Sequence, residues 1–294
     1  MRLEDDGDRS NVEDRRGSGF GGIPMGGTGV RLGLGGTVVV LALSLLFGRD
    51  LFSDLGAAPA GAPMAASTPA PSTAQVERRQ AGERQLERTA VTSFNDAQRT
   101  WSTALARRPG GYPDAKLVLF WDQTRSGCGD AGAEMGPFYC PADEKVYLDL
   151  GFYRELAQRF GAPGQFAQAY VIAHEMGHHL QNLLGIEGKM RQAQQRNPSQ
   201  RNALSVALEL QADCFAGAWG RTAKDRQLLD AGDLESGLNA ASAVGDDRIQ
   251  KAATGRVSPD SFTHGSAAQR AKWFRRGFDS GGLDACDTFG SGEL

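Results

Sequence analysis

Three of the four histidines in this 294-residue chain fall within six consecutive positions, with the spacing of a metal site. His174 and His178 flank Glu175 in the pattern H-E-x-x-H, which follows an apolar, helix-like stretch. Side chains four residues apart lie on one face of an α-helix, so both imidazoles can bind one metal ion, with Glu175 turned off that face. A carboxylate in that place can take a proton from a water that zinc has acidified and give it to a leaving amine. The pattern therefore indicates zinc and peptide-bond hydrolysis.

A catalytic zinc uses three protein ligands and one open position, so a third donor is needed elsewhere in the chain. Glu209 lies on the next strong helical segment, and Asp213 follows it by one turn. The alternative for these two acids is an ordinary solvated helix face. Their neighbours are apolar, however, and a buried acid among them needs a metal or an ion pair. We predict that Glu209 completes the zinc site and that Asp213 accepts a hydrogen bond from the outer nitrogen of a ligand histidine.

These two segments resemble the gluzincin metallopeptidases, in which the H-E-x-x-H helix is paired with a later helix bearing E-x-x-A-D or a close relative. More closely, the chain resembles the bacterial "putative neutral zinc metallopeptidase" family. Further matching stretches are residues 10–16, 135–141, 263–266 and 269–270, so the likeness covers nearly the whole chain except an Ala/Pro-rich spacer. The resemblance implies one zinc ion per chain, a single-pass membrane anchor and an external domain that acts on protein or peptide substrates.

The remaining histidines each leave an alternative open. His179 lies four residues after Glu175 and could form its own ligand pair with it, but the frame of His174 and His178 leaves Glu175 free for catalysis. We then expect His179 on the helix rim or against a neighbouring helix. His264 either caps a following helix or faces the cleft, where it would stabilise the oxyanion, and we include it among the candidate catalytic residues.

The elements that position these residues are mostly helical. The sequence predicts a helix from about residue 75 to Pro109, strands at Lys116 to Asp122 and Lys145 to Leu150, and helices almost throughout thereafter. Breaks are predicted at residues 161–164, 185–188, 197–198 and 255–259. We therefore expect an α+β, mostly helical, zincin-like domain with a small sheet.

Four cysteines and no C-x-x-C pair favour disulfides over a zinc ribbon. Three pairings are possible, and we favour Cys128 with Cys140, which would tie a glycine-containing loop. Cys214 would then pair with Cys286 and hold the C-terminus to the helix of Glu209. Buried free thiols are the alternative if the domain is cytosolic.

The N-terminal 31 residues are predicted to be a disordered tail. Residues 1–16 are dense in acids and arginines and contain few large apolar side chains, so we expect them to be solvated. Residues 17–36 are rich in glycine, but no lysine follows in P-loop position and no strand precedes them. We interpret this stretch as a flexible lead-in rather than a phosphate-binding loop.

Residues 32–48 are the one candidate membrane segment, although sixteen uncharged residues in a helix span only about 24 Å against a hydrocarbon core of about 30 Å. A cleaved signal peptide is the alternative, but thirty mixed-charge residues come first, which favours an uncleaved signal-anchor. Arg15, Arg16 and Arg31 precede the segment and Arg49 follows it, which places the N-terminus in the cytoplasm.

The predicted organisation is therefore a tail at residues 1–31, a transmembrane signal-anchor at 32–48, an Ala/Pro-rich linker at 49–75 and a zinc metallopeptidase domain at 76–290. We expect the domain on the periplasmic or extracellular side of the bacterial inner membrane. The net charge of −3 and the absence of a basic stripe argue against nucleic acid as a partner. Two rival functions remain, a membrane-tethered zinc protein that binds without cleaving and an envelope interaction module without metal.

Overall fold

The computed structural model describes residues 1–3, 7–17 and 72–290. The predicted membrane segment at 32–48 and most of the predicted linker lie outside these residues. Among the helices in the described ranges, none is both long enough and apolar enough to cross a membrane. The first described helix begins at Thr73, three residues before the predicted start of the domain at residue 76.

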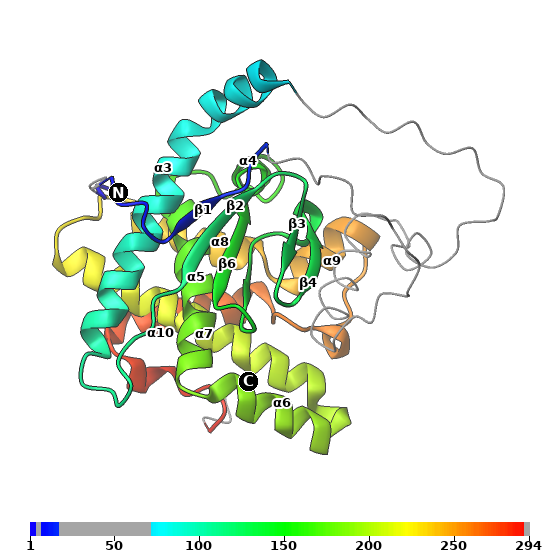
Figure 1. Ribbon diagram of the computed structural model, residues 1–294. Helices are drawn as coiled ribbons and strands as arrows, with labels where there is room; N and C mark the ends of the chain where they lie inside the picture. Colours follow the sequence, from blue (N-terminus) through cyan, green and yellow to red (C-terminus); the bar gives the residue numbers. More distant parts are fainter. Residues whose placement is uncertain (4–6, 18–71, 291–294) are drawn as a thin grey trace.

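The described residues form a mostly helical α+β fold with a small sheet, as predicted (Figure 1). The helices are α3 (Thr73–Ala104), α4 (Gly151–Gln158), α5 (Gln165–Leu183), α6 (Ile186–Arg196), α7 (Arg201–Asp225), α8 (Asp233–Ala243), α9 (Asp246–Thr254) and α10 (Ala267–Ser280). The strands are β1 (Val12–Asp14), β2 (Lys116–Phe120), β3 (Gln123–Ser126), β4 (Gly129–Gly132), β5 (Phe138–Cys140) and β6 (Lys145–Asp149).

The main sheet has the strand order β1-β2-β6-β5 (Figure 1). The first three strands are parallel, and β5 is antiparallel to β6. The two central strands, β2 and β6, are the ones that the sequence predicts, and their side chains are almost all buried. Strands β3 and β4 form a separate hairpin that was not predicted, because all its residues except Ala131 are polar or glycine and no apolar alternation marks it.

The prediction of a disordered tail is wrong for residues 7–17, which contain strand β1. Leu117 donates its backbone N–H to the carbonyl of Asn11 at 2.8 Å, and Arg15 donates to the carbonyl of Leu119 at 2.7 Å. Val12 packs against the main core. The segment orders despite its charge because the domain supplies a strand edge and ion partners, which composition alone does not reveal.

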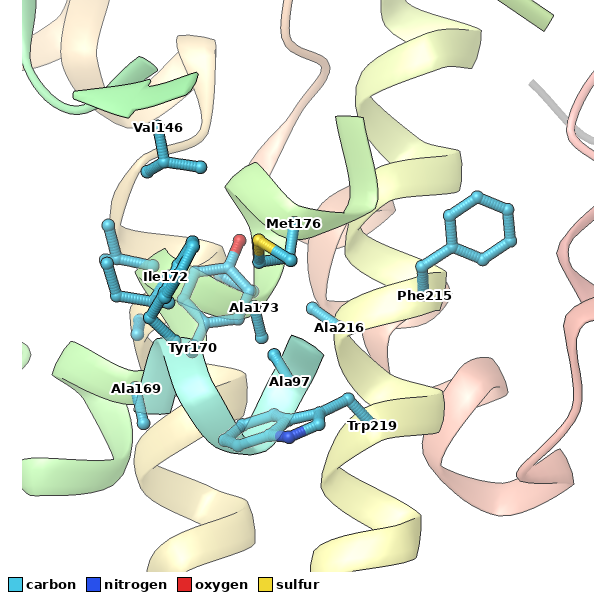
Figure 2. Packing of buried hydrophobic residues seen from close by; sticks show 14 of the residues in the cluster. Ala97, Val146, Ala169, Tyr170, Ile172, Ala173, Met176, Phe215, Ala216 and Trp219 are labelled. Carbon is cyan, nitrogen blue, oxygen red and sulfur yellow. The ribbon is translucent and has the colours of Figure 1, made fainter. Parts of the chain in front are cut away.

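Helix α5 runs through the centre of the domain and packs against α3, α7 and α8. It is buried on nearly every side because it is surrounded by protein. Ala173 and Met176 of α5 belong to one core cluster with Ala97 of α3 and with Ala216 and Trp219 of α7, and the cluster is seen from close by in Figure 2. The H-E-x-x-H segment is therefore carried by a helix of the domain's core.

Glycines allow two close helix contacts that bring the site together. A Cβ at Gly177, inside the H-E-x-x-H segment, would lie 3.0 Å from the backbone of Ala212 on α7. On the other side of α7, a Cβ at Gly277 of α10 would lie 1.8 Å from the carbonyl oxygen of Cys214, and one at Gly217 would lie 2.0 Å from the carbonyl oxygen of Phe274. Helix α7 is thus held closely between α5 and α10.

Both disulfides are present in the pairing that the sequence favoured. Cys128–Cys140 joins the turn of the β3–β4 hairpin to β5, and Cys214–Cys286 joins α7 to the C-terminal 3-10 turn. The second bridge fastens the chain end to the helix that carries Glu209.

Candidate metal centre

Two imidazoles from α5 and one carboxylate from α7 converge on a single point. His174 Nε2 lies 3.2 Å from Glu209 Oε2, and His178 Nε2 lies 3.5 Å from Glu209 Oε1. One ligand atom from each of the three residues lies within 4.8 Å of the others. Tetrahedral zinc with bonds of about 2.1 Å separates neighbouring ligand atoms by about 3.4 Å. The donors that the sequence analysis predicted therefore fit one zinc ion in spacing and in chemical type.

The outer nitrogen of each histidine is bound by an acceptor, which fixes the tautomer. His174 Nδ1 donates to Asp213 Oδ1 at 2.9 Å, and His178 Nδ1 donates to Gln181 Oε1 at 2.8 Å. The amide of Gln181 is itself oriented, because its nitrogen donates to the carbonyl of Leu208 at 2.7 Å. With Nδ1 protonated in both rings, each Nε2 keeps a lone pair for a metal.

Asp213 accepts a hydrogen bond from a ligand histidine, as predicted, and it also accepts hydrogen bonds from two further residues. Arg270 Nε donates to Asp213 Oδ2 at 2.8 Å, Arg270 Nη2 donates to Oδ1 at 3.0 Å, and the Tyr170 hydroxyl donates to Oδ1. Burial alone would raise the pKa of Asp213, but the charges of Arg270 and His174 hold it below its ordinary value. A buried guanidinium thus keeps ionised the carboxylate that orients His174.

The electrostatics of the centre favour a cation between its acids. Burial would raise the pKa of Glu209, but the charges of His178 and His264, together with the hydrogen bond from His174, hold it well below its ordinary value. Burial would lower the pKa of His174, but Asp213 and Glu209 raise it to about 10. Glu209 is therefore ionised, and positive charge is stabilised beside it. Without a metal that charge is a proton on His174, and a bound metal ion would take its place.

Glu175, the predicted general base, is a buried residue of α5. It follows His174 directly, so it is rotated by about 100° around the helix axis from that ligand. It is 7% exposed and lies outside the group of three donors. Its carboxylate is therefore free of a ligand role.

His179 belongs to the core, not to the metal centre. It is fully buried, its Nε2 lies 2.9 Å from the carbonyl of Pro113, and its Nδ1 lies 3.0 Å from the Tyr139 hydroxyl. Both ring nitrogens are engaged, and burial lowers its pKa. The expectation of a helix-rim or helix-contact position is wrong, since His179 instead ties α5 to β5 and to the loop before β2.

His264 does not cap the last helix, since Ser266 is the N-cap of α10 and accepts from the backbone N–H of Gln269. The His264 side chain is 27% exposed, and its Nδ1 lies 3.2 Å from Asp246 Oδ1. The other oxygen of Asp246 accepts from the backbone N–H groups of Thr263, His264 and Gly265. Burial lowers the pKa of His264, but the charges of Glu209 and Asp246 raise it, so the ring lies within the field of Glu209.

Four residues of this site were not assigned a role from the sequence. They are Tyr170, Gln181, Asp246 and Arg270. Gln181 could have been found from its position three residues after His178 on the same helix, because residues three apart are neighbours. Tyr170 could have been found in the same way, because it lies four residues before His174 on that helix. Asp246 and Arg270 reach the site only through tertiary packing.

A family model described as "Putative neutral zinc metallopeptidase" matches residues 1–289, and thus covers the site and β1 together. The chain belongs to this family. The family supports the assignment of a zinc-dependent hydrolase and of zinc as the metal for the three donors. It agrees with the resemblance found in the sequence.

Relatives extend over most or all of the chain. "Uncharacterized protein YpfJ" of Escherichia coli (strain K12) is 46% identical over 293 residues, which cover 99% of each chain. "Uncharacterized protein Rv2575" of Mycobacterium tuberculosis (strain H37Rv) is 43% identical over 215 residues, which cover 69% of this chain and 71% of the relative. No solved structure matches the chain.

Proposed function

We propose that this family member is a zinc-dependent peptidase that hydrolyses protein or peptide substrates. The observation that carries the proposal is the convergence of His174 Nε2, His178 Nε2 and the Glu209 carboxylate. Glu175 follows His174 directly on α5. The site would hold one zinc ion through these three residues. When bound there, zinc supplies a Lewis acid that acidifies water and polarises the scissile carbonyl.

The side chains of the site divide the remaining work. Glu175 takes the proton of the attacking water and passes it to the leaving amine. Asp213 and Gln181 hold the imidazoles of His174 and His178 in the orientation that a metal requires. Arg270 donates hydrogen bonds to Asp213 and keeps this carboxylate ionised.

For His264 we propose a role in stabilising the oxyanion that forms as water adds to the carbonyl. Asp246 fixes its ring through Nδ1 and fixes its loop through three backbone N–H groups. Glu209 and Asp246 favour the cationic form of this ring by raising its pKa. In that form Nδ1–H is held by Asp246 and the Nε2–H can donate to developing negative charge. We propose this role on the basis of the partly exposed position of His264 and its electrostatic coupling to Glu209.

We also propose that the domain works outside the cytoplasm. Two disulfides that use all four cysteines favour an oxidising compartment. Membrane attachment through residues 32–48 remains a prediction from the sequence.

The decisive experiment compares the purified full chain with its Glu175→Gln variant on a labelled, unfolded protein substrate. We expect the variant to keep its zinc and to lose at least about 100-fold in rate, because a general base contributes about 10²–10⁴-fold. Glu155→Gln, an exposed carboxylate of α4, is the matched control and should cleave normally. Equal cleavage by the Glu175 variant would contradict the mechanism, and a wild-type protein that binds zinc without cleaving would favour a binding role.

A further inference from the structure

The stretch Ser10 to Arg16 is singled out by the sequence but takes no part in the metal chemistry. In the structure it forms an edge strand of the main sheet, on the far side from β5 (Figure 1). Val12, Glu13 and Asp14 pair in parallel register with Leu117, Val118 and Leu119 of β2. The segment is therefore part of the sheet of the domain.

One arginine of the segment is buried among acids of the domain. The side chains of Arg16 and Glu83 are each 2% exposed, and Arg16 Nη1 lies 3.4 Å from Glu83 Oε2. Arg16 Nη2 also lies 2.7 Å from Glu87 Oε2 and 2.7 Å from Asp14 Oδ2. A charge withdrawn from water in this way requires its partners, so the cluster specifies one position for the segment on α3.

Residues that precede Arg16 in the segment make further contacts with the domain. Glu13 Oε1 accepts from Lys145 Nζ of β6 at 2.7 Å. Asn95 of α3 donates to the carbonyl of Asp8 at 2.9 Å. The docked segment therefore contacts α3, β2 and β6 at once, which is the behaviour of an integral strand.

We infer that residues 7–17 are a built-in strand of the metallopeptidase domain and lie on the same side of any membrane as the metal centre. The backbone hydrogen bonds between the segment and β2 are 2.7–2.8 Å long, whereas a hydrocarbon core is about 30 Å thick. A single membrane crossing between residues 17 and 72 would place β1 and β2 on opposite faces. The sequence predicted a cytoplasmic N-terminus and an external domain. The docked strand argues against that topology. This inference does not use the metal or the proposed activity.

Single cysteines test the side on which each part lies. All four native cysteines are in disulfides, so an added cysteine is the one free thiol of the full chain. Ser10→Cys marks the strand segment and Ser199→Cys marks the domain, and both positions are exposed. In spheroplasts of a bacterial host treated with a membrane-impermeant maleimide, we expect both variants to be labelled, or both to be protected until lysis. Labelling of one in intact spheroplasts and of the other only after lysis would overturn the inference.

A second pair of cysteines tests whether the strand docks on its own domain. Asn11 Nδ2 lies 3.3 Å from Asp114 Oδ2, so cysteines at these two positions face each other. In the full-length Asn11→Cys/Asp114→Cys variant we expect mild oxidation to remove both free thiols while the chain remains monomeric on a non-reducing gel. Asn11→Cys alone is the control and should keep its thiol. Free thiols in the double variant, or covalent dimers, would contradict docking within one chain.

Discussion

The metal centre and the N-terminal strand both bury charged side chains, but they differ in what they leave unpaired. At the strand, Arg16 has Asp14, Glu83 and Glu87 around it, and Trp121 Nε1 donates to Glu83 at 2.9 Å. At the metal centre, Asp213 is fully occupied, yet two imidazole nitrogens and one carboxylate face one another across 3.2–3.5 Å. We call the Arg16 group the closed cluster, because each charge in it has a partner, and such a cluster stabilises the fold and fixes the place of the segment. We call His174, His178 and Glu209 the open set, because their ligand atoms face a common point where a metal ion can bind.

Glu209→Gln would break the open set most severely. The amide keeps the shape of the carboxylate but removes its charge. Mutating a residue that only hydrogen-bonds to a metal ligand lowers metal affinity by about 10–100-fold, and we expect a larger loss of zinc affinity here because a ligand itself is changed. Peptide hydrolysis should be lost with it. Chelator competition measures the affinity, with Glu155→Gln as the control. A variant that binds zinc as tightly as wild type would exclude Glu209 as a ligand.

Asp213→Asn should have a smaller effect on the same set. The variant loses the anion that orients His174, so we expect about a 10–100-fold loss of zinc affinity. It also leaves Arg270 buried without its partner, which lowers stability. Zinc affinity measured on the folded fraction separates the two effects, and an unchanged affinity would mean that Asp213 serves stability alone.

Arg16→Gln should affect the closed cluster and leave the open one intact. Breaking a buried ion pair costs about 3–5 kcal/mol of folding free energy. Arg9, which is 52% exposed and also pairs with Glu87, gives the matched control Arg9→Gln with an expected loss of about 0–1 kcal/mol. Denaturant titration measures both variants. If Arg16→Gln weakened zinc binding in the folded protein, the two regions would be coupled and the comparison would fail.

The sequence predicts the centre of the site well because the ligand pattern is local. His174, Glu175 and His178 share one helix, whose spacing alone orients them, and Glu209 stands on the next strongly helical segment. The two central strands are likewise marked by apolar residues. Short-range periodicity is enough for these features.

The remaining features depend on contacts between distant parts of the chain. Arg270 and Asp246 reach the site because Gly217 and Gly277 let α10 pack closely on α7 and because the loop before α10 folds back onto α9. Strand β1 is charged and short, and it is held by α3 and β2, which are distant in the sequence. The separation between Arg16 and Glu83 of α3, for example, is 67 residues. No pattern within the segment itself reports such partners.

The most direct test of the central claim is the metal content of the purified full chain, together with X-ray absorption at the zinc edge. The account predicts one equivalent of zinc with two imidazole nitrogens and a carboxylate oxygen among its ligands. Less than about half an equivalent of zinc, not restored by added metal, would contradict it, as would a coordination shell without imidazole.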